Sequence, residues 1–256
     1  MTTEASTAQA GAEGTRWIHA HRLTWARKEL LRHFYISEYF ERILRAMPRG
    51  RSLEVGAGPG FFAEYHRCDV VTDVAPAPHV DQVVDVHAMP FPDESFDCVV
   101  GIDVAHHFYY PAKGLMEIAR ILRPSGRLIL VEPWTGPLGY FVNKYLHTED
   151  CFPIADPWAP VLTNAKNAMQ GNATIPKSLF FDNAQSLVEH TGLRTLQVSP
   201  FSCLGFLSTE GFTRWSLPKV IGRAIIKLDR KVPDSLLRYL AMKVFIVAER
   251  VPAVER

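Results

Sequence analysis

One short run restricts the fold of this chain more than any other, residues 52–62, which read SLEVGAGPGFF. An apolar strand carries an acidic residue, Glu54, near its end, and glycines then occupy every second position at Gly56, Gly58 and Gly60. Because glycine lacks a Cβ atom and adopts positive φ, such a turn lets backbone approach a ligand closely. A glycine-rich turn is weak evidence alone, so its meaning depends on the segments that follow.

Strand and helix patterns alternate after this turn. The near-continuous apolar run over 96–102 is typical of a strand buried on both faces. Helical spacing is expected over 59–66 and 112–122, and strands over 51–56, 70–73, 83–85, 96–102 and 127–132. This alternation predicts an α/β fold with a parallel, doubly wound sheet.

The alternation stops after Pro133. Residues 134–178 hold tryptophans, prolines and asparagines without a clear period, which favours a functional insertion over a passive loop. A helix near 183–191, a strand near 193–200, a basic helix near 217–231 and a last strand over 241–249 follow. Residues 16–47 read as helical and rich in aromatic and basic side chains, and the small, polar residues 1–15 are expected to be disordered.

Composition excludes several classes of protein. With 256 residues, 47% of them hydrophobic, the chain can bury one full core. A net charge of +1 gives no field that would favour nucleic acid. The four cysteines are far apart, which predicts reduced thiols, a cytoplasmic protein and no zinc site. We also expect no signal peptide and no membrane-spanning segment, and the oligomeric state is not readable from the sequence.

Five motifs in register resemble the class I S-adenosylmethionine (SAM)-dependent methyltransferases, of the broad small-molecule kind. In chain order they are 54–60 (EVGAGPG), 72–73 (TD), 85 with 89–97 (D, MPFPDESFD), 103–107 (DVAHH) and 117–127 (EIARILRPSGR). The resemblance covers residues 51–133. The stretches 145–149 and 170–173 also faintly resemble a bacterial branch linked to polysaccharide or lipid-linked sugar synthesis.

The resemblance implies a Rossmann-like sheet of seven mostly parallel strands, with the last strand antiparallel. Residues 16–256 would form one domain: a helical lid (16–47), a SAM-binding core (48–133), a substrate-binding insertion (134–178) and the end of the core (179–256). The implied activity is methyl transfer to a small-molecule acceptor, and we expect a hydroxyl of a sugar, a lipid-linked compound or a natural product.

The resemblance also implies the residues of the cofactor site. Glu54 would meet the cofactor's amino group, and Asp73 would accept the ribose hydroxyls. Asp85 would take the adenine amino group, although a turn-capping role is the plain alternative. The remaining expected contacts come from the turn (Gly56, Ala57, Gly58), from backbone beside the adenine (Val86) and from the end of the fourth strand (Ile102, Asp103).

Three histidines are candidates for catalysis. His106 and His107 follow the fourth strand, and ligands of open parallel sheets sit at the carboxyl ends of the strands. An imidazole with its ordinary pKa near ~6.5 suits a general base, whereas one of the two is also expected to pack into the fold. His147, with Glu149 beside it, could bind or deprotonate an acceptor hydroxyl, or lie on a polar helix surface.

The basic helix near 217–231 has two interpretations. Its stripe of Lys219, Arg223 and Lys227, with apolar Ile221, Ile225 and Leu228, could contact anionic lipid or a phosphorylated substrate. The alternative, which we favour at this point, is a solvated face over a packed one.

Two other functions compete with methyl transfer. A nicotinamide-dependent oxidoreductase is disfavoured because the turn is G-x-G-x-G, with Glu54 before it, and not G-x-G-x-x-G. A non-methylating or non-catalytic SAM-binding protein stays open, since the motifs concern the cofactor and not the reaction.

Overall fold

The structure, a computed structural model, describes residues 16–146, 150–161, 170–209, 211–213 and 216–252. The expected disordered tail and His147 lie outside these residues. Among those that it describes, no helix is both long and apolar enough to cross a membrane.

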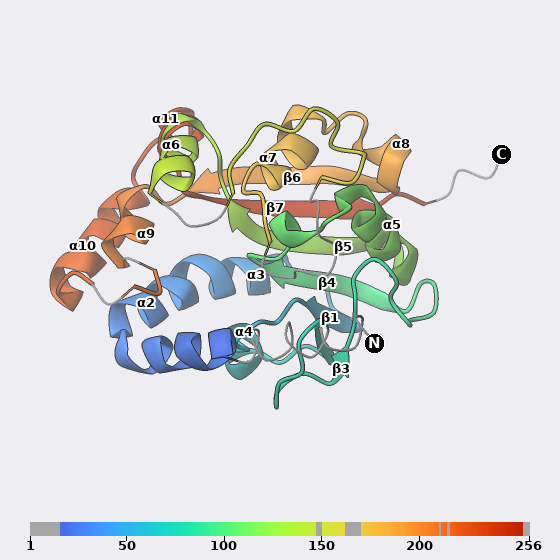
Figure 1. Cartoon of the computed structure of the whole chain (residues 1–256), viewed down its shortest axis with the longest axis horizontal. Coiled ribbons are helices and arrows are strands. Elements are labelled where there is room, and N and C mark those ends of the chain that lie inside the picture. The colour runs from blue at the N-terminus through green and yellow to red at the C-terminus, as the bar shows by residue number, and fades with distance from the viewer. Residues whose placement is uncertain (1–15, 147–149, 162–169, 210, 214–215, 253–256) are drawn as a thin grey trace, which may run out of the picture.

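A seven-stranded sheet runs through the molecule (Figure 1), with strand order β3-β2-β1-β4-β5-β7-β6. The strands are β1 (Ser52–Val55), β2 (Val70–Asp73), β3 (Gln82–Val83), β4 (Phe96–Ile102), β5 (Leu122–Pro133), β6 (Leu193–Phe201) and β7 (Lys243–Arg250). Only β7 runs antiparallel to its neighbours, β5 and β6. The predicted sheet of seven strands with an antiparallel last strand is therefore confirmed.

The sheet separates two apolar cores, because alternate residues of each strand face opposite sides. On β5, Leu128 and Leu130 face one core, and Ile129 and Val131 face the other. The first core is covered by α5 (Pro111–Ile121), α7 (Ile175–Lys177), η3 (Ser178–Asp182) and α8 (Leu187–Thr191). The second is covered by α2 (Glu29–Phe34), η1 (Tyr35–Phe40), α3 (Glu41–Ala46), α4 (Phe61–Tyr65) and α10 (Lys219–Asp229).

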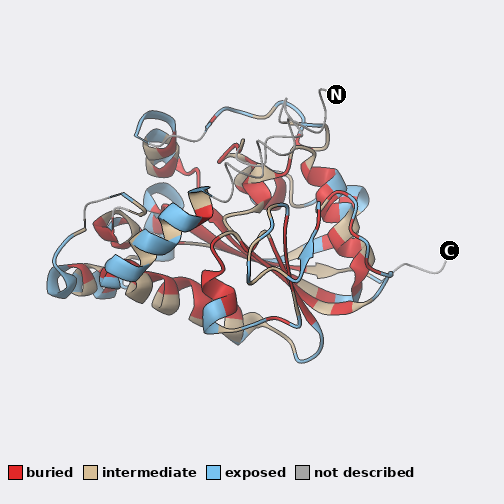
Figure 2. Ribbon diagram, turned by 60° about the horizontal axis from the view of Figure 1, so that its bottom comes forward, coloured by how far each residue is buried: buried red, intermediate tan, exposed pale blue. Residues whose placement is uncertain are grey.

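Burial follows this layering (Figure 2), with red strands inside and pale-blue faces on the outer helices. The predicted N-terminal helical segment is helical from residue 16 to residue 46, with a break at Lys28. Its second half is core, because Leu31, Phe34 and Tyr39 are fully buried.

Several element boundaries differ from the predicted ones. β5 begins at Leu122, five residues early, because Leu122 pairs with Phe96 across a register shift. The segment 134–178 contains the helix α6 (Pro137–Tyr145), which starts with proline in its first turn. The short helices α9 (Leu204–Thr209) and α11 (Asp234–Leu240) were not expected either. Helices this short carry too few residues to show a period in the sequence.

Candidate functional site

The glycine turn between β1 and α4 has the left-handed backbone that its sequence predicts. The φ angles of Gly56, Gly58 and Gly60 are 62°, 52° and 76°. A Cβ atom at Gly56 would lie 2.1 Å from a methyl carbon of Val104. The turn is therefore packed tightly against the residues that follow β4, and side chains would both strain and displace it.

Asp73, at the end of β2, fixes this turn. Its carboxylate accepts hydrogen bonds from the backbone N–H of Gly58 at 2.7 Å and of Ala75 at 2.8 Å. Ala57 donates its backbone N–H to the Thr72 carbonyl at 3.0 Å. These bonds bring three of the predicted cofactor residues together at the carboxyl ends of β1 and β2.

Glu54 lies beneath the same turn and is 4% exposed. Its Oε2 atom is buried and has no hydrogen-bond partner among the described residues. Burial, and then the nearby charge of Asp73, raise the pKa of the Glu54 carboxyl to about 8. A buried acceptor without a donor is costly, and a cationic or N–H-bearing ligand would satisfy it.

Asp85 lies after β3 and caps a turn, as the plain alternative proposed. Its Oδ1 atom accepts hydrogen bonds from the backbone N–H of His87 at 2.9 Å and from His87 Nδ1 at 2.6 Å. Burial lowers the pKa of His87, against the opposing effect of this hydrogen bond. About half of the Asp85 side chain is exposed, so the turn contact leaves room for a ligand. Val86 is half-buried against the first core.

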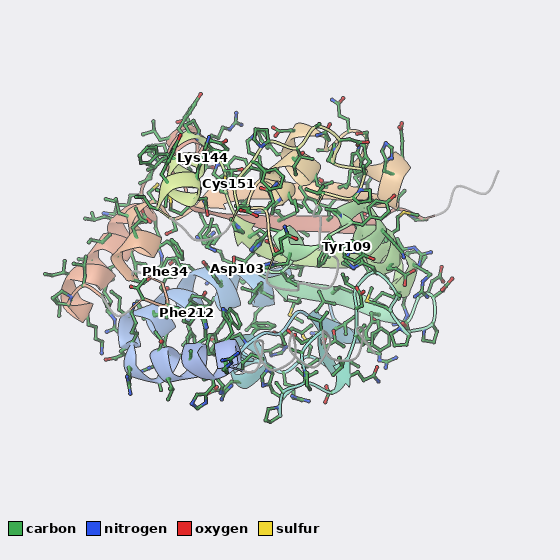
Figure 3. The ribbon with its side chains drawn as sticks, in the orientation of Figure 1. Phe34, Asp103, Tyr109, Lys144, Cys151 and Phe212 are labelled. Atoms are coloured by element: carbon green, nitrogen blue, oxygen red, sulfur yellow. The ribbon has the colours of Figure 1, made fainter. Side chains whose placement is uncertain are left out.

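Asp103 ends β4 in a left-handed conformation, with φ 50°. Its carboxylate accepts a hydrogen bond from Lys243 Nζ at 2.6 Å, and Lys243, at the start of β7, is itself buried. Ile102, just before it, packs against the second core. Figure 3 labels Asp103 near the centre of the molecule, with Phe34 of α2 on the side of the N-terminal helices.

A buried tyrosine hydroxyl lies in the same region. Tyr39 Oη has no hydrogen-bond partner among the described residues. Burial, and then the charge of Asp103, raise the pKa of Tyr39 well above its usual value. Lys243 Nζ lies 6.0 Å from the centre of the Tyr39 ring. The Tyr39 hydroxyl is thus a buried polar group that a ligand could satisfy.

His106 forms a buried pair with Glu132, at the carboxyl end of β5. Nδ1 of His106 lies 2.7 Å from Glu132 Oε2, so the imidazole donates and the carboxylate accepts. Glu132 Oε1 also accepts the backbone N–H groups of Val104 at 3.0 Å and Ala105 at 2.7 Å. When Nδ1 donates in this way, a neutral His106 carries its lone pair on Nε2.

Ligand atoms of Asp103, His106 and Glu132 all lie within 4.8 Å of one another, a spacing that a metal ion could use. Lys243 already neutralises Asp103, and Glu132 already accepts three N–H donors. We therefore assign these residues to a hydrogen-bonded network that orients His106.

The insertion after β5 reaches the histidine pair. His107 Nδ1 donates to the Gln170 carbonyl at 3.2 Å, and Asn172 donates its backbone N–H to the His106 carbonyl at 2.8 Å. Asp150 pairs with Asn172 through an isolated bridge. Gln170 and Asn172 thus contact the predicted catalytic histidines, and Asp150 contacts Asn172. The third candidate, His147, lies outside the described residues.

The helix over residues 16–27 covers the glycine turn. A Cβ atom on Gly58 would lie 3.6 Å from the Trp17 ring, and Arg22 donates to the Pro59 carbonyl at 2.7 Å. Trp17 stacks near His21, with ring centres 3.9 Å apart. Its role as a lid stays a prediction.

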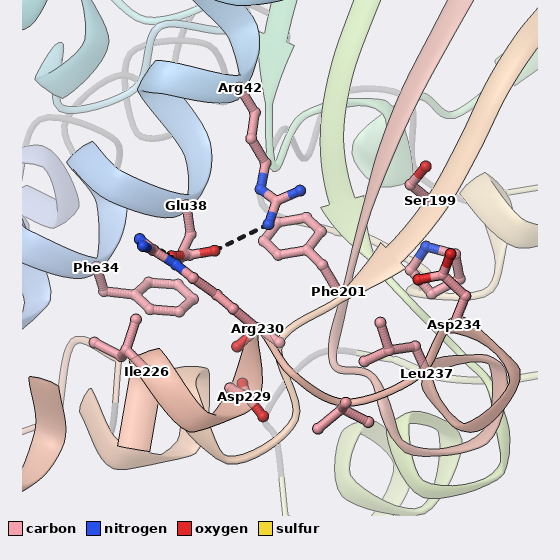
Figure 4. Close-up of a pocket in the computed structure, with 13 residues that line it drawn as sticks. Phe34, Glu38, Arg42, Ser199, Phe201, Ile226, Asp229, Arg230, Asp234 and Leu237 are labelled. Carbon is pink, nitrogen blue, oxygen red and sulfur yellow. Dashed lines mark hydrogen bonds and ion pairs between the residues drawn. The ribbon is translucent and has the colours of Figure 1, made fainter. Parts of the chain in front are cut away.

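A pocket of about 240 Å³ lies elsewhere, between η1, the end of β6 and the segment that joins α10 to α11. Glu38 occupies its wall and pairs with Arg42 and Arg230 (Figure 4). In the sheet, β4, β5 and β7 lie between β6 and β1, the strand before the glycine turn, so the pocket is distinct from the site around that turn.

Comparisons with known proteins identify the domain. Residues 53–130 match the family model described as "Methyltransferase domain". This range is a class I SAM-dependent methyltransferase domain. The glycine turn, Asp73, Asp85 and Asp103 lie within it.

Two curated relatives match part of the chain. YafE, an uncharacterized protein of Escherichia coli, is 31% identical over 98 residues, which is 35% of this chain and 47% of the relative. The demethylmenaquinone methyltransferase of Renibacterium salmoninarum is 31% identical over 119 residues, 40% of this chain and 50% of the relative. The chain spans half or less of these relatives.

A solved structure shares the whole fold. It is a chain in the complex between the Haloferax volcanii Trm112 methyltransferase activator and a methyltransferase, with a TM-score of 0.56. The match covers 96% of this chain and 100% of that one at 14% identity, which shows likeness of fold.

The methyltransferase domain fits SAM, since the buried Glu54 carboxylate lacks a partner beside the glycine turn. Sequence reasoning missed Glu132, Lys243 and Tyr39. Glu132 had a signal, an acidic residue ending a predicted apolar strand. Lys243 and Tyr39 had none, because only the antiparallel placement of β7 and the packing of η1 bring them to the site.

Proposed function

We propose that this protein transfers a methyl group from SAM to a hydroxyl of a sugar, a lipid-linked compound or a natural product. The observation that carries the proposal is Glu54, a buried carboxylate with a partnerless oxygen beside a glycine turn. A nicotinamide cofactor would place its phosphates near this turn, and the Glu54 carboxylate would repel them. The same carboxylate would attract the ammonium group of SAM.

Residues of this chain would hold the cofactor as follows. Glu54 would bind the ammonium group directly or through water, and the turn over Gly56, Ala57 and Gly58 would let backbone approach the cofactor closely. Asp73, which fixes that turn, would accept the ribose hydroxyls, and Asp85 with the Val86 backbone would bind the adenine. When bound, SAM supplies a methyl group made electrophilic by its sulfonium. The protein supplies proximity and orientation, which are worth ~7–11 kcal/mol in favourable cases.

An oxygen acceptor also requires a proton acceptor. His106 is oriented by Glu132, so that its Nε2 atom can take the proton from the acceptor hydroxyl. Glu132 stabilises the imidazolium that results, in the way that a buried carboxylate serves a histidine base. Asp103, Lys243 and Tyr39 line the same region and suit a polar acceptor.

The acceptor is proposed from this polarity and from the insertion, whose residues 170–172 contact the histidine pair. One relative is named for demethylmenaquinone, which supports a small organic acceptor. For this chain we favour a hydroxyl, because a hydroxyl is a weak nucleophile until a base takes its proton, and the His106–Glu132 pair offers such a base.

Calorimetry with SAM, and with NADH as a control, tests the cofactor. We expect saturable binding of SAM and none of NADH, and the reverse would contradict the proposal. Methyl-labelled SAM incubated with an organic extract of cells tests the reaction. Label in a small molecule that depends on the protein supports methyl transfer, whereas binding without label favours a non-methylating SAM-binding protein.

A further inference from the structure

Three helices, α6, α10 and α11, lie at one end of the molecule (Figure 1). They expose large apolar side chains. We call them the terminal helices. Their exposed apolar residues are Phe141, Tyr145, Val220, Ile221, Leu228, Leu236, Tyr239 and Leu240. Scattered exposed apolar residues need no explanation. Here α6 packs against α11, and α10 lies at the same end of the molecule, so the exposed residues form a group that indicates an interaction surface.

The packing of α10 shows which of its faces is exposed. Gly222 faces α2 so closely that a Cβ atom there would lie 2.2 Å from a methyl carbon of Leu30. Ile226, on the same face, is buried. The opposite face therefore points outward and carries Val220, 81% exposed, and Leu228, 63% exposed. The interpretation that a packed apolar face lies beneath a solvated basic one is wrong for Ile221 and Leu228.

The segment that contains α10 and α11 is strongly cationic. Residues 217–240 contain six basic and two acidic residues, a net charge of +4 in a chain whose total is +1. The basic residues are Lys219, Arg223, Lys227, Arg230, Lys231 and Arg238. Lys219 pairs with Glu29, and Arg230 with Glu38. Lys227 and Lys231 are exposed and alternate with Ala224 and Leu228 along the outward face.

The terminal helices adjoin the proposed acceptor site. α6 follows β5, four residues after Pro133, and α11 precedes β7, whose first residue is Lys243. Trp134, between β5 and α6, donates its Nε1–H to the carbonyl of Arg238 in α11 at 3.0 Å, so the two helices are joined beside the end of β5. The surface and the site thus lie at the same edge of the sheet.

From these observations we infer that the terminal helices bind the surface of an anionic phospholipid bilayer. Apolar side chains enter the boundary between headgroups and acyl chains, and Lys227, Lys231 and Arg238 contact the anionic headgroups. Such binding holds the acceptor site near the membrane surface. The inference is independent of the proposed function, because it concerns a surface that contains none of the cofactor residues.

A second copy of the chain is a poorer occupant of this surface. A two-fold contact places the same patch against itself, and the basic residues of the two patches that have no ion pair within the described chain would repel each other. An anionic bilayer offers both the opposite charge and an apolar layer.

Vesicle co-sedimentation of the full chain tests the inference, without SAM. The probes are vesicles of phosphatidylcholine alone and of phosphatidylcholine with 30% phosphatidylglycerol. We expect binding at least ~10-fold stronger to the anionic vesicles, and weaker binding as salt rises. Val220→Asp with Leu228→Asp should reduce that binding ~10-fold or more, and so should Lys227→Glu with Lys231→Glu.

Met116→Asp and Lys113→Glu are matched controls, because both residues are exposed on α5 and lie outside the terminal helices. Both should bind vesicles as the wild type does, and all variants should keep the thermal unfolding midpoint and SAM affinity of the wild type. Failure of the wild type to bind anionic vesicles would overturn the inference. Equal losses in the α5 controls, or a dimer that Val220→Asp with Leu228→Asp dissociates, would overturn it as well.

Discussion

At the scale of single residues, the domain depends on carboxylates that the fold keeps from water. Glu54 has lost its hydration and gained no donor from the described chain, whereas Glu132 is fully buried and accepts three hydrogen bonds. The two residues thus have opposite functions. Glu132 is satisfied and positions other groups, and Glu54 remains available to a ligand.

Glu54→Gln should change how stability and SAM affinity depend on pH. Because the folded-state pKa is raised from 4.5 to about 8, native protein holds a proton that the unfolded chain has released. Stability is therefore lost as pH rises from about 4.5 to about 8, on the order of 3–5 kcal/mol. The variant lacks this loss, which urea unfolding at several pH values measures.

SAM binding gives the complementary test of Glu54. The ionised carboxylate binds a cation better, so wild-type affinity should rise between about pH 6 and 8, by up to ~10-fold per unit. Glu54→Gln should bind SAM more weakly at pH 8 and lose most of this pH dependence, by calorimetry. Unchanged affinity at pH 8 would mean that Glu54 does not contact the cofactor. Glu64→Gln, on the exposed side of α4, is the control.

His106→Asn should lower turnover by ~10²–10⁴ while SAM affinity stays near that of the wild type. The reason is that His106 is the histidine with a buried carboxylate partner. His107→Asn is the matched control, since Nδ1 of His107 donates to the backbone carbonyl of Gln170 and not to a buried carboxylate, and the loss of turnover should be much smaller. If His107→Asn is the slower enzyme, the roles of the two histidines are exchanged.

At the scale of elements, the N-terminal helices divide into two functions. α2 and η1 form part of the second core, through Leu31, Phe34 and Tyr39. The preceding helix over residues 16–27 touches the glycine turn through Trp17 and Arg22. The prediction of a lid therefore applies to residues 16–27, because the later helices are part of the core.

Trp17→Ala tests that narrower lid. We expect SAM to dissociate several-fold faster, in stopped-flow measurements, with a loss of unfolding free energy below ~1 kcal/mol, because Trp17 is only half-buried. Trp25→Ala is the contrast. Trp25 stacks on Phe61 of α4 at 4.1 Å, so this variant should lose ~2–4 kcal/mol of stability. Equal SAM dissociation rates for the wild type and Trp17→Ala would contradict the prediction that residues 16–27 act as a lid.

At the scale of the whole molecule, β7 joins β6 to the rest of the sheet. It lies between β5 and β6, and its seven-residue ladder with β5 spans Arg127 to Pro133. Both cores receive side chains from it, Val244 and Ile246 on one side and Phe245 and Val247 on the other. The last regular strand is thus an interior strand of the sheet.

A chain that ends at Leu240 should therefore not fold cooperatively. Without β7, β5 and β6 lose their shared partner, and both cores lose buried side chains. Circular dichroism and intrinsic fluorescence should show no coincident unfolding transition. A chain that ends at Pro252 keeps β7 and should unfold as the full chain does. Cooperative unfolding of the shorter chain would show that the first five strands fold independently.

The sequence by itself determined the central part of this protein. Apolar runs with sharp ends, as over 96–102, and glycines that need positive φ, as at Gly56, are local properties, so they predicted β4, the glycine turn and the alternating fold. An acidic residue at the end of an apolar run is also local, which is why the sequence placed Glu54, Asp73 and Asp103 at or just after strand ends.

Tertiary structure decided the rest. The pairing of β7 with β5 brings Lys243 to Asp103 across 140 positions of sequence, and no local pattern encodes a contact at that separation. The outward face of α10 is another case. An amphipathic helix shows that two faces differ, but not which one packs. The contact of Leu30 with Gly222 shows which face of α10 packs against α2. Only the face with Gly222 has no side chain to keep Leu30 at a distance.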